Sequence, residues 1–195
     1  MHDQSKPAPT DRPDPHPTGD NPAATAAKID DGPRIYVACL AAYNDGILHG
    51  RWISVTDPAD IWEAVNAMLA ASPVLNAEEY AIHDYEGFDG ATLSEWASFE
   101  SVCALADFIT EHGELGAKLY AHFGDCLDDA QTAMDNYCGD HKNLADFAEE
   151  IFSEPIPPSL DYYIDWQAMG RDMELSGDIF TIATGFEQVH IFWAH

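Results

Sequence analysis

The chain has 195 residues and carries 35 Asp and Glu against 8 Lys and Arg, a formal net charge of −27. A protein with this charge is not expected to bind DNA, which is itself a polyanion. A disordered acidic chain is also excluded, because 46% of the residues are hydrophobic and 5 Trp, 8 Tyr and 9 Phe are present.

The negative charge extends over the whole of the folded sequence. Residues 34–195 contain 29 acidic and 5 basic residues, so 29 − 5 gives a net charge of −24. Duplex DNA carries two charges per base pair, so this charge corresponds to roughly 12 base pairs. Ordinary protein surfaces mix both signs. The sequence therefore predicts a protein that can imitate DNA.

The cysteines and the hydropathy pattern indicate a cytoplasmic protein. Cys39, Cys103, Cys126 and Cys138 are scattered and form no CxxC pair. The N-terminus has no secretory signal pattern, and no run of 18 apolar residues is present. We therefore expect reduced thiols and no association with a membrane.

The first third of the chain divides into a tail and a small lobe. Residues 1–33 are rich in Pro, Asp and Thr and lack aromatic residues, which predicts a disordered tail. Strands are predicted at 34–40, 49–55 and 79–85. A helix is predicted to begin at Asp57-Pro58, an N-cap candidate followed by Pro at the first helical position. These elements predict an α+β lobe over 34–92.

The remaining sequence predicts two further lobes. Helices are expected over 93–112, 114–123 and 125–137, which gives a helical middle lobe over 93–137. The last lobe, 138–195, is predicted to be α+β. It has a helix from Asn143, a longer helix over 160–175 and a hairpin of 178–183 with 188–193. We expect an elongated α+β chain of three small lobes, since elongation keeps the carboxylates apart.

Two groups of residues resemble metal sites. His122, Cys126, Cys138 and His141 form an H-x3-C-x11-C-x2-H pattern, but zinc motifs normally keep the two thiolates close together. Asp84–Glu95 resembles a calcium loop, but its fifth and sixth positions do not fit. We expect neither a metal nor a cofactor. A metal-dependent hydrolase built on the His and Cys residues remains an alternative.

No pattern in the chain indicates catalysis. GxSxG, P-loop and GxGxxG motifs are absent from the sequence. Pairs of acids such as Asp128/Asp129 are adjacent on predicted helices, where they diverge instead of facing each other across a cleft. We expect no catalytic residues and no enzymatic activity.

Several segments, in order and spacing, resemble the ArdA antirestriction family and cover nearly all of 34–195. They are Arg34-Ile-Tyr-Val-Ala-Cys-Leu40, Tyr43-Asn-Asp-Gly46, His49-Gly-Arg-Trp-Ile53, Glu79-Tyr-Ala-Ile-His-Asp-Tyr-Glu-Gly-Phe88, Tyr137 and Gly139 before Leu144-Ala-Asp-Phe-Ala-Glu-Glu150, and Tyr163-Ile-Asp-Trp166 through Arg171-Asp-Met-Glu-Leu-Ser-Gly-Asp-Ile-Phe180. Residues 1–33 look like an extension beyond the usual start of the family.

The resemblance implies a protein from mobile DNA that occupies the DNA groove of type I restriction-modification enzymes. Its partners are then the DNA-recognition and methyltransferase subunits. It also implies a three-lobed chain that forms a homodimer imitating bent duplex DNA, without catalytic residues. The alternative from the residues alone is an acidic mimic of DNA, or a chaperone, for another basic DNA-binding protein.

The densest run of acidic residues borders the predicted last lobe, and we expect it to bind the partner. Recognition should be distributed over these carboxylates, because contacts that replace phosphates position a partner without specifying it. The candidate residues are Asp125, Asp128, Asp129, Asp135, Asp140, Asp146, Glu149, Glu150 and Glu154.

Overall fold

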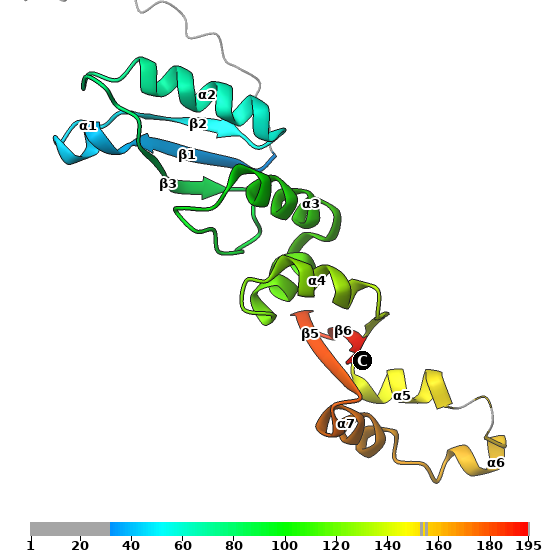
Figure 1. Cartoon of the computed structure of the whole chain (residues 1–195). Coiled ribbons are helices and arrows are strands. Elements are labelled where there is room, and N and C mark those ends of the chain that lie inside the picture. The colour runs from blue at the N-terminus through cyan, green and yellow to red at the C-terminus, as the bar shows by residue number, and fades with distance from the viewer. Residues whose placement is uncertain (1–31, 153, 155, 195) are drawn as a thin grey trace, which may run out of the picture. The chain divides into compact units, whose positions relative to one another are not determined.

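The computed structural model describes residues 32–152, 154 and 156–194 (Figure 1). The predicted tail over 1–33 lies outside the described residues, apart from Gly32 and Pro33. The fold is α+β, as predicted, with two antiparallel three-stranded sheets and helices packed against them (Figure 1).

The first sheet has the order β2-β1-β3, with β1 at Arg34–Cys39, β2 at Gly50–Ser54 and β3 at Tyr80–Glu86. Ile35, Val37 and Cys39 alternate along β1 and are fully buried. Helix α2 (Pro58–Ala70) packs on the sheet through its own apolar stripe. The predicted cap is confirmed, since the Asp57 carboxylate accepts the backbone N–H of Ala59 at 2.8 Å. A short helix that was not predicted, α1 (Leu40–Asn44), follows β1.

Helix α3 (Phe99–His122) begins six residues later than predicted, and the expected helical start at residue 93 was wrong. The Ser98 hydroxyl accepts the N–H of Ser101 and caps the helix there. The preceding loop instead meets β3, where Ile82 N–H donates to the carbonyl of Glu95 at 3.0 Å. Gly113 interrupts α3 with a φ of 58°, close to the predicted break. Helix α4 follows at Leu127–Met134.

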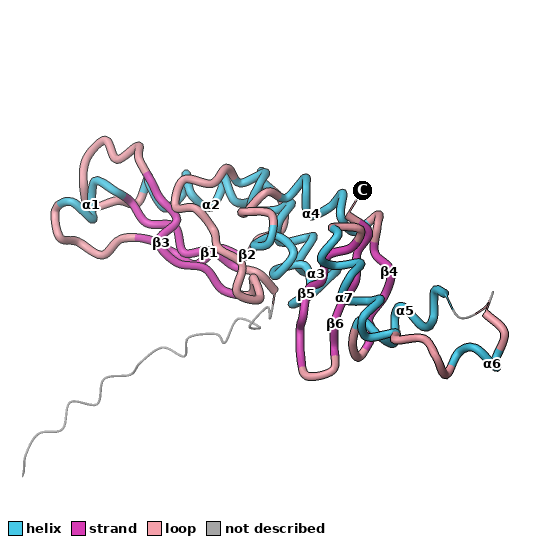
Figure 2. Tube along the Cα trace, turned by 90° about the horizontal axis from the view of Figure 1, so that it is seen from below, coloured by secondary structure: helices cyan, strands magenta, loops and turns pink. Residues whose placement is uncertain are grey.

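The second sheet has the order β4-β6-β5, with β4 at Tyr137–His141, β5 at Ile179–Gly185 and β6 at Gln188–Trp193. The hairpin of β5 and β6 is confirmed and is visible in Figure 2. The sequence did not predict β4, because Gly139 resembled a helix stop. Gly139 instead lies inside the strand, with a φ of 113°, at a shift in the register with β6.

Helices α5 (Leu144–Phe152), α6 (Pro158–Asp161) and α7 (Trp166–Ser176) complete the fold. The single helix predicted over 160–175 was wrong, because Asp165 caps a new helix by accepting the N–H of Ala168 at 2.9 Å. Helices α5 and α7 pack against each other. A Cβ atom on Gly170 would collide with the backbone carbonyl of Leu144, so this close approach requires glycine.

Three hydrophobic clusters hold these elements together. The first contains residues of the first sheet, α2 and the first part of α3. The second joins α3 and α4 to Ile182 and Phe192 of the second sheet. The third contains Phe147, Met173, Ile179 and Ile191. The lobe boundaries after residues 92 and 137 remain predictions.

Candidate partner-binding surface

The carboxylates that the structure describes are exposed to solvent. Every Asp and Glu from Asp45 to Glu187 whose side chain the structure describes is exposed. Within the described ranges, only Glu86, Glu114 and Asp172 form an ion pair with Lys or Arg. Most of the described acidic side chains are therefore available to a partner.

The few basic residues are largely engaged close to where they lie. The Nε of Arg34 donates to Glu86 at 2.7 Å, and its guanidinium lies over the ring of Trp52. The ammonium of Lys118 donates to the carbonyl of Ala183 at 2.7 Å and lies 2.9 Å from Glu114. These contacts neutralise carboxylates locally and leave the overall negative field intact.

Helix α5 carries three of the predicted site residues on one exposed face. Asp146, Glu149 and Glu150 are three and four residues apart, and such side chains are neighbours on a helix. Phe147 and Ala148 are fully buried and hold the helix in the fold. Glu154 is exposed beyond the end of the helix. The structure therefore brings Asp146, Glu149 and Glu150 together.

The acidic residues around α4 point in different directions. Asp125 and Asp128 line one cavity, of about 440 Å³, together with Tyr120. Burial raises the pKa of Tyr120, and the nearby Asp125 raises it further. Asp129 lines a different cavity. Asp135 occupies the C-cap of α4, where the helix dipole disfavours a negative charge. This part of the predicted set does not form a single patch.

Asp140 lies in β4 opposite His190 of β6. His190 is buried, with its Nδ1 2.7 Å from the Tyr137 hydroxyl and its Nε2 2.9 Å from the Thr184 hydroxyl. Burial lowers the pKa of His190; Asp140 raises this pKa and Lys118 lowers it. A buried imidazole with two hydroxyl partners is a structural element of the second sheet, and Asp140 is exposed beside it.

Sequence reasoning left out a row of acidic residues on α3. Glu100, Asp107 and Glu111 are seven and four residues apart, which places them on one side of the helix, and all three are exposed. Their helical spacing is the signal that could have identified them. The exposed acidic surface therefore extends beyond the predicted run of 125–154.

Three of the four candidate metal ligands make other contacts, and Cys126 lies at the N-cap of α4. The imidazole of His122 stacks on Phe180 at 5.0 Å, and Nδ1 of His141 lies 3.7 Å from Glu150. The thiol of Cys138 lies 3.5 Å from the carbonyl of Asn136, and burial raises the pKa of this thiol. Across the residues that the structure describes, no group of three or more His, Cys, Asp or Glu side chains could hold a metal ion. The ligand set of the alternative hydrolase is thus not assembled.

None of the helices in the described ranges combines the length and the apolar character that a membrane span requires. No curated protein shows a significant match to the chain. The family model of the antirestriction protein ArdA matches residues 35–188. Proteins of this family are non-enzymatic inhibitors of type I restriction-modification enzymes. With most of its length matched, the chain belongs to the ArdA family of antirestriction proteins.

Proposed function

We propose that the protein inhibits a type I restriction-modification enzyme by imitating bent duplex DNA. It occupies the groove in which the DNA-recognition and methyltransferase subunits hold DNA. The observation that carries this proposal is the exposure of every described Asp and Glu side chain, nearly all without a Lys or Arg partner.

The carboxylates replace phosphates in contacts that the enzyme already makes. Lys and Arg side chains of the groove form charge-assisted hydrogen bonds with Asp and Glu as they do with phosphate oxygens. Binding then gains from electrostatic steering and from the release of counterions, which raise the association rate and the affinity at low salt.

The charges at helix ends support this reading. Helices α2, α4, α5 and α7 have no basic residue in the last turn, where Lys or Arg would stabilise them. Asp135 even places a carboxylate at the C-cap of α4. The absence of basic residues from these last turns and the presence of Asp135 lower helix stability. They also keep the surface negative, as imitation of DNA requires.

The full assembly in this proposal is an elongated, three-lobed homodimer. One chain from residue 34 onward carries the charge of roughly 12 base pairs, and a dimer doubles this length. We place the protein in the cytoplasm, where the enzyme meets DNA, and its gene on mobile DNA, as the resemblance to the ArdA family implies.

The test adds purified protein to a type I restriction-modification enzyme and follows DNA binding, methylation and cleavage in separate assays. Occupation of the groove predicts that all three fall together, at stoichiometric amounts and without turnover. Loss of cleavage while DNA binding persists would overturn groove occupancy. A basic nucleoid protein bound to DNA serves as the control. If the inhibitor displaces DNA from the nucleoid protein more effectively than from the restriction enzyme, a different partner is favoured.

A further inference from the structure

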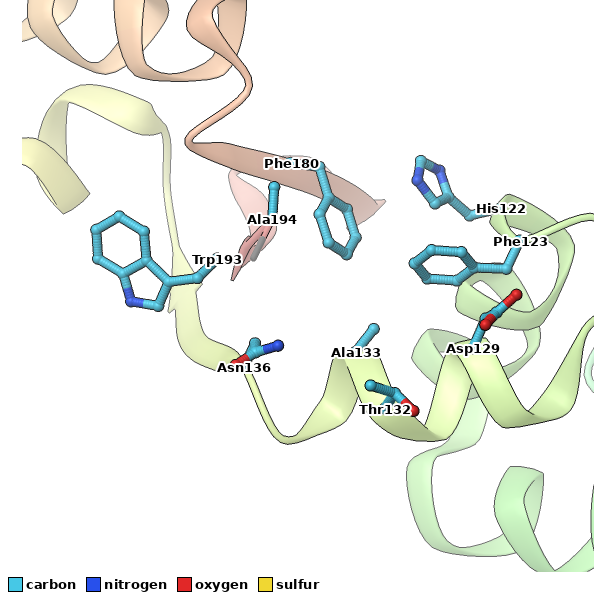
Figure 3. A pocket seen from close by; sticks show the side chains of 9 residues that line it. All are labelled: His122, Phe123, Asp129, Thr132, Ala133, Asn136, Phe180, Trp193 and Ala194. Atoms are coloured by element: carbon cyan, nitrogen blue, oxygen red, sulfur yellow. The ribbon is translucent and has the colours of Figure 1, made fainter.

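A cavity of about 370 Å³ opens between the end of α3, α4 and the second sheet (Figure 3). We call it the aromatic pocket. Its volume lies near the lower end of the range for ligand sites, which suits one large side chain. Its lining residues are His122, Phe123, Asp129, Thr132, Ala133, Asn136, Phe180, Trp193 and Ala194.

The rings of the aromatic pocket are held in fixed positions. Phe180 stacks on Phe192 of the core, with centroids 4.8 Å apart and planes within 8°. His122 stacks on Phe180 within 7°, and Phe123 meets Phe180 edge to face at 5.8 Å. Figure 3 shows the rings of His122, Phe123 and Phe180 near one another, with Phe123 next to Asp129. Because Phe180 already stacks on both Phe192 and His122, the aromatic surface open to a ligand is chiefly that of His122 and Phe123, whose preorganised positions reduce the entropy lost on binding.

The charge of the aromatic pocket selects a cation. Asp129 is exposed at the pocket, Asn136 and Thr132 add polar groups, and no lining residue is Lys or Arg. An anion would be repelled by Asp129 and by the body of the protein. A neutral apolar ligand would gain nothing from the Asp129 carboxylate, which is exposed to water.

Among cationic side chains, arginine fits best. Its planar guanidinium stacks on aromatic rings and donates paired hydrogen bonds to a carboxylate, whereas the lysine ammonium is compact and strongly hydrated. We propose that the aromatic pocket binds an arginine side chain of the target's DNA groove, with Asp129 accepting hydrogen bonds from the guanidinium. This proposal rests on the proposed function and makes Asp129 a local anchor within an otherwise distributed surface.

A matched pair of variants tests the role of Asp129. Asp129→Asn and Asp128→Asn each remove one charge from the first turn of α4, but only Asp129 lines the aromatic pocket. We expect Asp129→Asn to weaken inhibition about three- to tenfold, the size of the charge-assisted hydrogen bond that is lost with the carboxylate. Asp128→Asn should weaken it about twofold or less, as for a solvent-screened charge. Equal losses in the two variants would overturn the proposal.

A second pair tests the aromatic wall. Phe123→Leu removes a ring from the pocket, and Phe186→Leu removes one that is 94% exposed at the β5–β6 turn. We expect only Phe123→Leu to weaken inhibition, with both proteins retaining their near-ultraviolet circular dichroism. If a folded Phe123→Leu protein inhibits as well as the unchanged protein, the proposal that the aromatic pocket binds the target is overturned.

Small probes test the pocket without the enzyme. N-acetyl-arginine amide and N-acetyl-lysine amide are titrated into the 15N-labelled full chain, with the signals of Asp129, Asn136 and Trp193 followed by NMR. The arginine probe should shift these signals more than the lysine probe, and Asp129→Asn but not Asp128→Asn should reduce the shift. Equal shifts with the two probes, or no shifts at all, would overturn the proposed arginine site even if the protein inhibits the enzyme. Arginine binding without any inhibition of the enzyme would support the pocket and contradict the proposed function.

Discussion

Asp128 and Asp129 are neighbours in the first turn of α4, yet they line different cavities. Successive residues on a helix point about 100° apart, so a dense acidic run in the sequence spreads around the helix. The carboxylates of this chain consequently face several directions. A groove that reads many phosphates is suited to such a surface, because it gains from many weak contacts.

We predict that carboxylates outside the aromatic pocket contribute individually little and jointly much. Asp146→Asn, Glu149→Gln or Glu150→Gln alone should weaken inhibition by about 1 kcal/mol or less, as expected for exposed charges. Combining these three with Glu154→Gln should weaken inhibition progressively, measured by titration against the restriction enzyme. Thermal stability should change little, because relief of the repulsion between these like charges offsets the loss of the Asp146 carboxylate from the first turn of α5.

The contrary outcome is equally specific. If one of these four changes abolished inhibition while the protein remained folded, recognition would be focused at a discrete site. The distributed account would then be wrong.

Folding stability should depend on His190 below neutral pH. Burial lowers the pKa of His190 in the folded protein, whereas the unfolded chain takes up this proton near pH 6.5. The neutral imidazole therefore contributes its full stabilisation above about pH 6.5. This contribution is lost as the pH falls from there toward the lowered pKa of His190 in the folded protein. Urea unfolding at pH 7.5, 6.5 and 5.5 should show a decline that His190→Gln reduces. The exposed His83, changed to Gln, serves as control; an unaltered decline in His190→Gln would contradict this role.

Gly170 should tolerate no side chain. In Gly170→Ala the new methyl group meets the carbonyl of Leu144, so α5 and α7 must separate. We expect a loss of about 1–3 kcal/mol in the free energy of unfolding, as for overpacked sites. Urea denaturation measures it, with Gln167→Ala at an exposed position of the same helix as control. An unchanged denaturation midpoint for Gly170→Ala would show that the two helices pack less closely.

Removal of metal ions should leave the protein unchanged. The structure does not assemble His122, Cys126, Cys138 and His141 around a common point. We expect a chelator to alter neither far-ultraviolet circular dichroism nor inhibition, since a structural zinc would contribute directly to folding. Stoichiometric zinc in the purified protein, by elemental analysis, would refute this prediction.

The sequence predicted those elements whose ends carry a local signal. Asp57-Pro58 marks the start of α2, and Gly177, with a φ of 79°, ends α7 one residue beyond the predicted end at 175. It did not predict β4, because Tyr137–His141 contains no β-branched residue and depends on pairing with the distant β6. Whether β4 forms therefore depends on tertiary contacts with β6.

The candidate surface was predictable in its sign but not in its details. Composition alone predicted exposed carboxylates, since so many charges without partners cannot be buried. The aromatic pocket was not predictable, because His122, Asp129 and Phe180 come from separate segments that only the fold brings together. In the sequence, Phe123 and Phe180 resemble ordinary core residues.

The most direct test of the account measures whether the protein and DNA exclude each other from the type I methyltransferase. A labelled duplex is displaced by the full chain at several salt concentrations, and the inhibitor's affinity is determined at each one. Groove occupancy predicts that the apparent Kd for DNA rises in proportion to inhibitor concentration without reaching a plateau. It also predicts that the inhibitor's affinity falls steeply as salt rises. A ternary complex of enzyme, DNA and inhibitor, or an affinity that is the same at low and high salt, would contradict it.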